Sequence, residues 1–459
     1  MSSQPSNPWS ALPGDEPDDV VFTSLYGVRT IELNRPKKLN TLNGSMIRKI
    51  APRLLEWERS DMANVVVMKG AGDKVFCAGG DVAVLAQSNK AGAEGRKWST
   101  EYFGLEYKLD HLIATYQKPY IAFLDGITMG GGVGLSVHAP LRIATERTVF
   151  AMPETTIGFF PDVGASFFLS RLPGAVGTYL ALTSDRLTGA DVFYTGIATH
   201  YLHSTSLPRL ESRLAELRFK DYDDLDTRLR TVNAAVEEYC TGLPYDQPML
   251  LAGELRKAID RCFGQNSVAD IVSALQREAA AETGTKEWAA KTLDTLHQRS
   301  PTAVHVSLRQ MRIGRKWSLA EAFGREHQMA AQFMRHPDFT EGVTARLLEK
   351  RTPQWQPATL EDISPTEDVT KPFFEPSEET EPLELLNDRD YDEYPFRFGV
   401  PAESDVKALV QEGGSRPGQV VNLMVKKTRE KQGVKEVTEE IVARKTQTND
   451  SGLAEWVGS

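Results

Sequence analysis

The sequence predicts an α/β protein with a layered core of strands and helices, a helical region after it, and a charged extended tail. Short apolar runs alternate with stretches of helical spacing up to about residue 206, strand signals then stop, and past residue 355 charged residues dominate. We therefore expect four parts: an extended segment at 1–19, the α/β core at 20–206, a helical region at 207–355, and a tail at 356–459 that becomes ordered on a partner.

Composition limits the classes of protein that the chain can belong to. Its 459 residues suit two or three units, and 53 basic against 63 acidic side chains give a net charge of −10. An acidic chain is a poor candidate for coating nucleic acid, and no apolar run is long enough to span a bilayer. The three scattered cysteines indicate neither a disulfide framework nor a zinc site, and favour a reducing compartment. No metal is predicted.

The charges of the first segment do not fit a targeting sequence. Residues 1–28 contain no Lys or Arg but do contain four acids, whereas transit peptides are rich in Arg and secretory signals begin with basic residues. We expect an extended lead-in to the first strand.

Within the core, strand and helix signals follow one another along the chain. Residues 45–58 have apolar residues at helical spacing, and the other runs are short, apolar and bounded by turn residues. Strands are expected at 20–22, 28–33, 64–70, 118–126, 142–145 and 148–151. The interleaving of strands and helices predicts a layered sheet structure.

After the core the predicted elements are helices, at 210–219, 229–239, 249–262, 268–281, 287–297 and 319–335. Residues 375–394 hold many acids and a single Arg, a composition that does not bury enough apolar surface to fold alone. The mixed Lys/Glu stretch at 425–445 predicts a polar helix.

Two glycine-rich segments, 75–82 and 126–135, each connect a strand to a helix. Neither has the spacing of the dinucleotide fingerprint or the Gly-Lys-Ser/Thr of a phosphate-binding loop. Consecutive glycines expose backbone N–H groups, so two facing turns can aim one N–H each at a carbonyl oxygen, as in an oxyanion hole. For a single cluster, tight packing would be the preferred explanation; two clusters about fifty residues apart favour a site.

Several motifs occur in an order that resembles the crotonase superfamily, and most closely its 3-hydroxyisobutyryl-CoA hydrolase branch. They are Phe76-Cys77-Ala78-Gly79-Gly80-Asp81, the glycine-rich run 126–134, Ala151-Met152-Pro153-Glu154, Phe160-Pro161-Asp162, Ser300-Pro301-Thr302 and His336-Pro337-Asp338. The resemblance covers residues 20–355 and implies a crotonase-like core. The tail from about residue 375 has no counterpart in that pattern.

The resemblance also implies roles for individual residues. The N–H groups of Gly80 and Gly131 would bind a thioester oxygen, and Glu154 and Asp162 would be the catalytic acids. The implied substrate-binding residues are Ala78 (at the adenine end of coenzyme A), Asp81, Glu106, Gly131, Glu154 and Asp162. No cofactor is implied, because coenzyme A is part of the substrate.

One departure bears on the reaction. Hydratases of the superfamily use two glutamates, and the position of the first is Gly134 here, while the second is kept as Glu154. Because water addition needs an acid and a base on the same water, hydration is disfavoured and thioester cleavage is favoured. Glu154 attacking directly or activating water, and Asp162 orienting a hydroxyl or assisting proton transfer, remain alternatives. Alone, each acid could instead be a first-turn or turn residue after a proline.

Two functions follow from the resemblance. The first is hydrolysis of the thioester of 3-hydroxyisobutyryl-CoA in valine breakdown. The alternative is a structural subunit of the mitochondrial small ribosomal subunit, because fungal mitochondrial proteins of this type occur there. The expected partners are an acyl-CoA and, for the alternative, mitochondrial ribosomal proteins bound by the tail 356–459, with little direct nucleic-acid contact and no membrane. A location in the mitochondrial matrix is implied by the resemblance alone.

Overall fold

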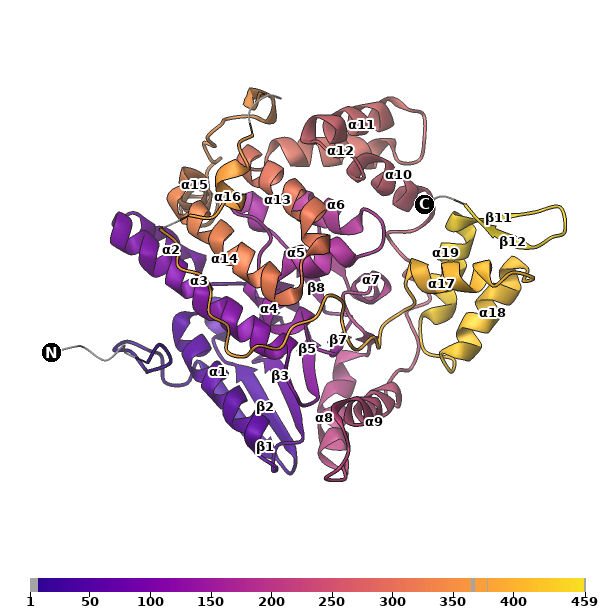
Figure 1. Cartoon of the computed structure of the whole chain (residues 1–459), viewed down its shortest axis with the longest axis horizontal. Coiled ribbons are helices and arrows are strands. Elements are labelled where there is room, and N and C mark those ends of the chain that lie inside the picture. Colours follow the sequence, from indigo (N-terminus) through magenta and orange to yellow (C-terminus); the bar gives the residue numbers. More distant parts are fainter. Residues whose placement is uncertain (1–6, 365–367, 378, 458–459) are drawn as a thin grey trace.

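The computed structural model describes residues 7–364, 368–377 and 379–457, so residues 1–6 of the predicted lead-in and residues 365–367, 378, 458 and 459 of the predicted tail lie outside it. In the described part, the chain passes back and forth between two sheets (Figure 1). The larger sheet has the strand order β1-β2-β3-β5-β7-β10: β1 (Val20–Leu25), β2 (Val28–Leu33), β3 (Val65–Gly70), β5 (Tyr120–Leu124), β7 (Leu141–Ala144) and β10 (His200–Tyr201).

The smaller sheet has the order β4-β6-β8-β9: β4 (Val75–Cys77), β6 (Ile127–Met129), β8 (Val149–Ala151) and β9 (Leu187–Thr188). Neighbouring strands are parallel except at the pairs β1·β2 and β8·β9. Each strand of the central series in the larger sheet is followed by one in the smaller sheet, so β3, β5 and β7 lead into β4, β6 and β8. The carboxyl ends of β4, β6 and β8 therefore meet at one edge.

Helices cover and connect these sheets. They are α1 (Gly44–Arg59), α2 (Val82–Asn89), α3 (Ala93–Ala114), α4 (Gly131–Val137), α5 (Ala165–Phe168), α6 (Val176–Thr183) and α7 (Ala190–Tyr194). Helix α1 begins where the sequence predicts, because the Asn43 side chain accepts a hydrogen bond from Met46 N at 2.8 Å and caps the first turn. Single turns of 3₁₀ helix lie at Pro36–Lys38, Glu154–Ile157, Leu169–Arg171, Ser204–Ser206, Gly314–Lys316 and Leu360–Asp362.

The region after residue 206 is helical, as predicted. Its helices are α8 (Leu207–Ala215), α9 (Leu225–Glu237), α10 (Gly253–Phe263), α11 (Val268–Ala280), α12 (Lys286–His297), α13 (Pro301–Ile313), α14 (Leu319–Arg335), α15 (Pro337–Val343), the π-helical turn Thr344–Glu349 and α16 (Lys371–Phe374). The Ser300-Pro301 motif starts α13: Ser300 caps Ala303 N at 3.1 Å and donates to Asp338 Oδ2 at 2.6 Å. No helix in the described residues is long and apolar enough to cross a membrane.

The tail differs from the prediction, because the structure orders it on the chain itself. Residues 383–400, the strap, lie along α3, α4 and α5 in Figure 1, where the orange-yellow coil crosses the front of the core. Apolar strap residues pack on the main core while its acids point outward; the packed residues are Leu383, Leu385, Leu386, Tyr391, Tyr394 and Val400. Alternation of apolar and acidic residues lets an acidic segment bury one side.

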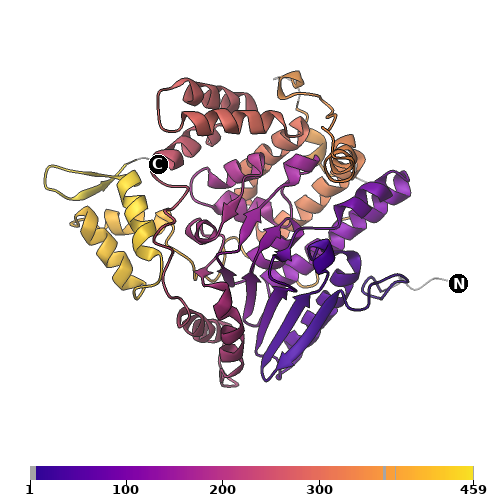
Figure 2. The ribbon, with the colours of Figure 1, turned by 180° about the vertical axis from the view of Figure 1, so that it is seen from behind.

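Beyond the strap, residues 401–457 form a separate C-terminal module with its own small core. It contains α17 (Glu403–Gln411), α18 (Pro417–Lys427), α19 (Val434–Lys445) and the hairpin β11 (Thr446–Thr448) with β12 (Ala454–Trp456). The polar helix predicted at 425–445 is in fact the end of α18 and all of α19, each with one buried face. Figures 1 and 2 both place the module at the side of the molecule, far from the N-terminal helices.

Candidate functional site

The site lies where three parallel strands of the smaller sheet end. The turn at Gly79 and Gly80 follows β4, the turn at Gly130 and Gly131 follows β6, and Glu154 follows β8. Because these strands are neighbours, their carboxyl ends bring the two glycine turns and the acid together. A Cβ built on Gly131 would lie only 3.3 Å from the backbone N of Gly80. The two turns predicted from the sequence are therefore in contact.

The backbone N–H groups of Gly80 and Gly131 take no part in the regular backbone hydrogen bonds around them. Gly80 forms a bridge with Leu42, whose hydrogen bonds run from Leu42 N to Gly79 O and from Asp81 N to Leu42 O, both at 2.8 Å. That bridge does not use the N–H of Gly80. Gly131 is the first residue of α4, and first-turn N–H groups have no acceptor inside their helix. Two donors thus lie side by side.

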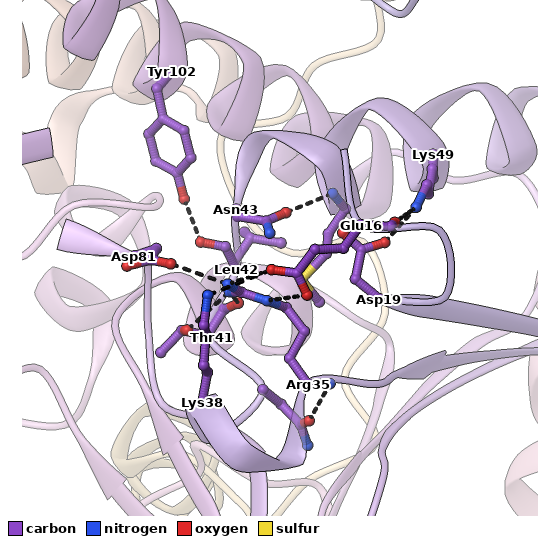
Figure 3. A network of polar contacts seen from close by, with 12 residues as sticks. Glu16, Asp19, Arg35, Lys38, Thr41, Leu42, Asn43, Lys49, Asp81 and Tyr102 are labelled. Carbon is purple, nitrogen blue, oxygen red and sulfur yellow. Dashed lines mark hydrogen bonds and ion pairs between the residues drawn. The ribbon is translucent and has the colours of Figure 1, made fainter. Parts of the chain in front are cut away.

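A polar network holds the first turn in place (Figure 3). Arg35 donates from Nη2 to Asp81 Oδ2 at 3.2 Å and to Glu16 Oε1 at 3.1 Å, and Tyr102 donates to the Leu42 carbonyl at 3.0 Å. Asp81 was predicted to bind substrate, but here its carboxylate is engaged by Arg35. Burial of Arg35 opposes its charge, and its pKa is nevertheless raised by Glu16 and Asp81. The acidic N-terminal segment therefore fixes the loop that carries Gly80.

Glu154 opens a 3₁₀ turn and points toward the second glycine turn. Its side chain is buried, with 5% of the residue exposed, and a Cβ on Gly130 would lie 3.0 Å from Glu154 Oε1. The other oxygen, Oε2, is buried and has no hydrogen-bond partner among the described residues. A buried carboxyl oxygen without a partner is costly and marks a place where a ligand or water can bind.

Helix α3 supplies two further carboxyl groups. It packs on the face of α4 that carries Gly131 and Gly134, where the absence of side chains leaves room for them. Glu106 Oε1 occupies the space where a Cβ of Gly131 would lie, and one turn later Asp110 Oδ2 lies 2.5 Å from a Cβ built on Gly134. Both oxygens of Asp110 are buried without a described partner. Position 134 thus has no side chain, and Asp110 from another helix fills the space beside it.

Asp162, in the loop before α5, accepts a hydrogen bond from a side chain. The hydroxyl of Tyr107, between Glu106 and Asp110 on α3, donates to Asp162 Oδ2 at 2.7 Å. Behind this loop, Glu326 of α14 accepts from Gly164 N at 2.6 Å and from Ser166 N at 2.9 Å, which fixes the backbone after Asp162.

Burial is the main influence on the charge of these acids. It raises the pKa of Glu106, Asp110 and Glu154 well above the usual range, and repulsion from neighbouring acids, Asp162 among them, adds to the effect. Burial raises the pKa of Asp162 to about 7, although its hydrogen bond from Tyr107 opposes the rise. The pKa of Glu326 is raised to about 8 for the same reason. The carboxyl groups of the site therefore bind protons more tightly than exposed acids do.

The structure brings together Gly80, Gly131, Glu106, Glu154 and Asp162. Ala78 precedes the first turn and is half-buried, with its N–H donating to Leu39 O at 3.1 Å. Tyr107, Asp110 and Glu326 were not identified from the sequence. The i, i+4 spacing of Glu106 and Asp110 on a helix was the one available signal for Asp110, and nothing local pointed to Glu326.

Chemically, the arrangement offers two backbone donors, a buried acid with an unoccupied oxygen, and a second acid of pKa about 7 held by a tyrosine. Donors placed beside an acid suit attack on a polarised carbonyl group. Among the described residues, no group of three or more His, Cys, Asp or Glu is arranged to hold a metal ion.

Comparison with known proteins gives one family. The family model described as Enoyl-CoA hydratase/isomerase matches residues 28–374. A solved structure of a carnitinyl-CoA dehydratase from Mycobacterium thermoresistibile superposes with a TM-score of 0.69 at 33% identity, covering 81% of this chain and 100% of that one.

Among curated relatives, small ribosomal subunit protein mS47 of Neurospora crassa is 59% identical over 437 residues, 94% of this chain and 86% of its own length. The mitochondrial 3-hydroxyisobutyryl-CoA hydrolase of Danio rerio is 43% identical over 347 residues, 75% of this chain and 87% of its own. The mS47 protein of Schizosaccharomyces pombe is 42% identical over 340 residues, 74% of this chain and 76% of its own.

Proposed function

The chain belongs to the enoyl-CoA hydratase/isomerase family, and on that premise we propose that it hydrolyses the thioester of a short 3-hydroxyacyl-CoA, specifically 3-hydroxyisobutyryl-CoA of valine breakdown. Water and the thioester give the free acid and the thiol of coenzyme A. The observation that carries the proposal is the position of Glu154, buried against the Gly130–Gly131 turn with one oxygen unpartnered. The identity to a named hydrolase over three quarters of the chain supports the substrate.

The proposed roles follow from the positions of the groups. The N–H groups of Gly80 and Gly131 hold the thioester oxygen, which gains negative charge as the carbonyl carbon is attacked, and each such donor is worth about 3–4 kcal/mol by mutational precedent. Burial makes Glu154 a stronger base than an exposed glutamate, which suits proton removal from water. Asp162 and Glu106 contact the acyl group, with Asp162 accepting from the substrate hydroxyl.

Hydrolysis is favoured over hydration because position 134 lacks a side chain. Water addition to a double bond needs a second carboxyl group on the water, and Gly134 supplies none at that position. Thioester cleavage needs one acid and the two donors. Direct attack by Glu154 remains an alternative to water activation.

The test is thiol release from 3-hydroxyisobutyryl-CoA by the purified chain and by Glu154→Gln, with Glu361→Gln as control because Glu361 is an exposed acid paired with His297 at 2.9 Å. We expect a loss of roughly 10³-fold or more for Glu154→Gln and none for the control. Equal rates in all three proteins would disprove the assignment. Direct attack by Glu154 expels the thiolate and forms an anhydride, and a single turnover in H₂¹⁸O detects this route because ¹⁸O enters Glu154 when water opens the anhydride at the glutamyl carbon.

A second proposed function is assembly into the small subunit of the mitochondrial ribosome, with a mitochondrial location in either case. The observation that favours it is the length of the match to the Neurospora crassa mS47 protein, which takes in most of the tail, whereas the Danio rerio hydrolase matches only 75% of the chain. Sedimentation of the full chain and of a chain ending at Phe374 with purified small subunits tests it. The proposal requires the full chain to travel with the subunits.

A further inference from the structure

The charges of the C-terminal module balance overall, but many of its basic residues are concentrated in one stretch of the sequence. Within a net charge of −10, residues 416–435 hold six basic residues and one acid. These residues form α18, the turn after it and the start of α19. Four exposed cations at the end of α18 and just after it, here named the basic patch, are Lys426, Lys427, Arg429 and Lys435, while Arg416, also exposed, lies at the other end of α18.

The basic patch is not used to attach the module to the core. Attachment uses other residues: Lys431 pairs with Glu237 at 3.0 Å, and Arg256 of α10 pairs with Glu403 at 3.0 Å. Lys426, Lys427 and Arg429 form no ion pair with any described residue. Lys435 has only a distant partner, Glu439 at 4.0 Å on its own helix. Their charges are available to a partner.

Helix stability alone does not account for this arrangement. Cations in the last turn of α18 interact favourably with the helix dipole, which is sufficient for Lys426 and Lys427. Lys435 lies in the first turn of α19, however, where the dipole disfavours a cation, and Arg429 lies in the turn between the helices with a φ of 56°. A common anionic partner explains all four positions.

The exposed side of α18 extends the basic patch. Gln419, Asn422, Leu423 and Lys426 are exposed and spaced for one helical face, and Leu423 is 45% exposed. Figures 1 and 2 show α18 at the outer edge of the module, away from the sheets. Amide and ammonium side chains in a row are suited to contacts with successive phosphate groups.

We propose that the basic patch, with the exposed face of α18, binds the phosphate backbone of RNA in the small mitochondrial ribosomal subunit. The inference rests on the second proposed function and adds the surface and the chemistry of the partner. A polyanion repels a chain of charge −10 except at a local basic surface, and release of counterions from phosphates supplies the affinity.

The comparisons agree with a role for the module that is separate from catalysis. The family match ends at residue 374, before the module, and the Neurospora crassa mS47 protein matches 94% of the chain. The Schizosaccharomyces pombe mS47 protein matches 74%. The module thus lies outside the part of the chain that the family model matches.

The experiment uses the full chain and two triple variants of equal charge change. One is Lys426→Glu/Lys427→Glu/Arg429→Glu. The control is Arg209→Glu/Arg218→Glu/Lys220→Glu, which reverses three exposed cations on α8 and the loop after it. Each protein is titrated with protein-free RNA of the small subunit at several salt concentrations, sedimented with intact small subunits, and assayed for thioester hydrolysis.

We expect the patch variant to bind RNA at least roughly tenfold more weakly, and the slope of log affinity against log salt to fall by about 2–3. The control should bind as the wild type does, and hydrolysis should be unchanged in both variants. Equal RNA binding by wild type and patch variant overturns the inference. The inference is also overturned if the wild type does not bind free RNA and the patch variant no longer sediments with the small subunits. That result would indicate an acidic protein partner. If the wild type does not travel with subunits at all, the ribosomal proposal fails as well.

Discussion

Glu106, Asp110, Glu154 and Asp162 are buried close together, and none of the four makes an ion pair with a described residue. Burial disfavours the charged form of each carboxyl group, and with no cation beside them their pKa values are raised. The resemblance to the crotonase superfamily implied three of these acids, Glu106, Glu154 and Asp162. Their protonation depends on neighbours that no motif contains, such as Tyr107.

The hydroxyl of Tyr107 lowers the pKa of Asp162, so Tyr107→Phe should raise that pKa above about 7. Because Asp162 is proposed to accept a hydrogen bond from the substrate hydroxyl, and its ionised form accepts more strongly, the acid limb of kcat/KM should move to higher pH by up to about one unit. Rates at pH 6 then fall while rates at pH 8.5 recover. The control is Tyr116→Phe, which removes a hydroxyl bonded to Leu54 O at 2.8 Å. An unshifted profile for Tyr107→Phe contradicts the assignment.

Asp110 should make the protein less stable as pH rises. Its pKa is raised in the folded state, so above about pH 4 the unfolded chain releases a proton that the folded chain keeps, and stability falls by up to about 1.4 kcal/mol per pH unit. Asparagine does not titrate, so the free energy of unfolding of the Asp110→Asn variant should depend less steeply on pH. Urea unfolding at pH 5, 6 and 7 measures the slope, with exposed Asp450→Asn as control. Identical slopes would argue against a buried neutral acid.

At the scale of elements, the glycine turns show what local sequence predicts well. Both connect a strand to a helix as expected, and α14 spans Leu319–Arg335 as its apolar spacing predicts. Helix α10 begins at Gly253, four residues later than predicted, and α3 was not predicted although it carries Glu106. Many inward residues of α3 are polar or charged, so its apolar stripe is weak and periodicity alone does not reveal it.

Packing of α3 against α4 gives a test at this scale. In Gly131→Ala the new Cβ would overlap Glu106 Oε1 and lie 3.3 Å from the N of Gly80, so we expect kcat/KM to fall by roughly 10²-fold or more. Gly324→Ala in α14 is the matched control, because no atom lies within 4 Å of its Cβ position; there alanine should stabilise the helix by about 0.5–1 kcal/mol without changing the rate. Full activity in Gly131→Ala would rule out close packing at the site.

At the scale of the whole molecule, the strap connects the tail to the helix that bears the site. His111 of α3 bonds the Arg389 carbonyl at 3.0 Å, Arg389 pairs with Glu58 at 2.9 Å, and Tyr394 bonds His138 Nδ1 at 2.9 Å. The outer side of α3 is thus covered by the strap while its inner side carries Glu106.

Two truncated chains should distinguish the effect of the strap from that of the C-terminal module. A chain ending at Val400 keeps the strap and loses a module that has its own core, so hydrolysis should stay within about twofold of the full chain. A chain ending at Phe374 also exposes the outer side of α3, and we expect a lower unfolding temperature and a lower rate. Thermal unfolding and thiol release compare the three chains. Equal behaviour of the two shortened chains would show that the strap does not support α3.

The sequence by itself determined the alternation of strands and helices, the two glycine turns and the acids at 154 and 162, because these depend on spacing and on chemistry within a few residues. Tertiary structure alone decided the rest. Tyr107 reaches Asp162 across 55 positions, Ser166 reaches Glu326 across 160, and Tyr394 reaches His138 across 256. Burial and proton affinity arise from such distant neighbours, so a linear pattern identifies a carboxyl group but does not show whether it is charged.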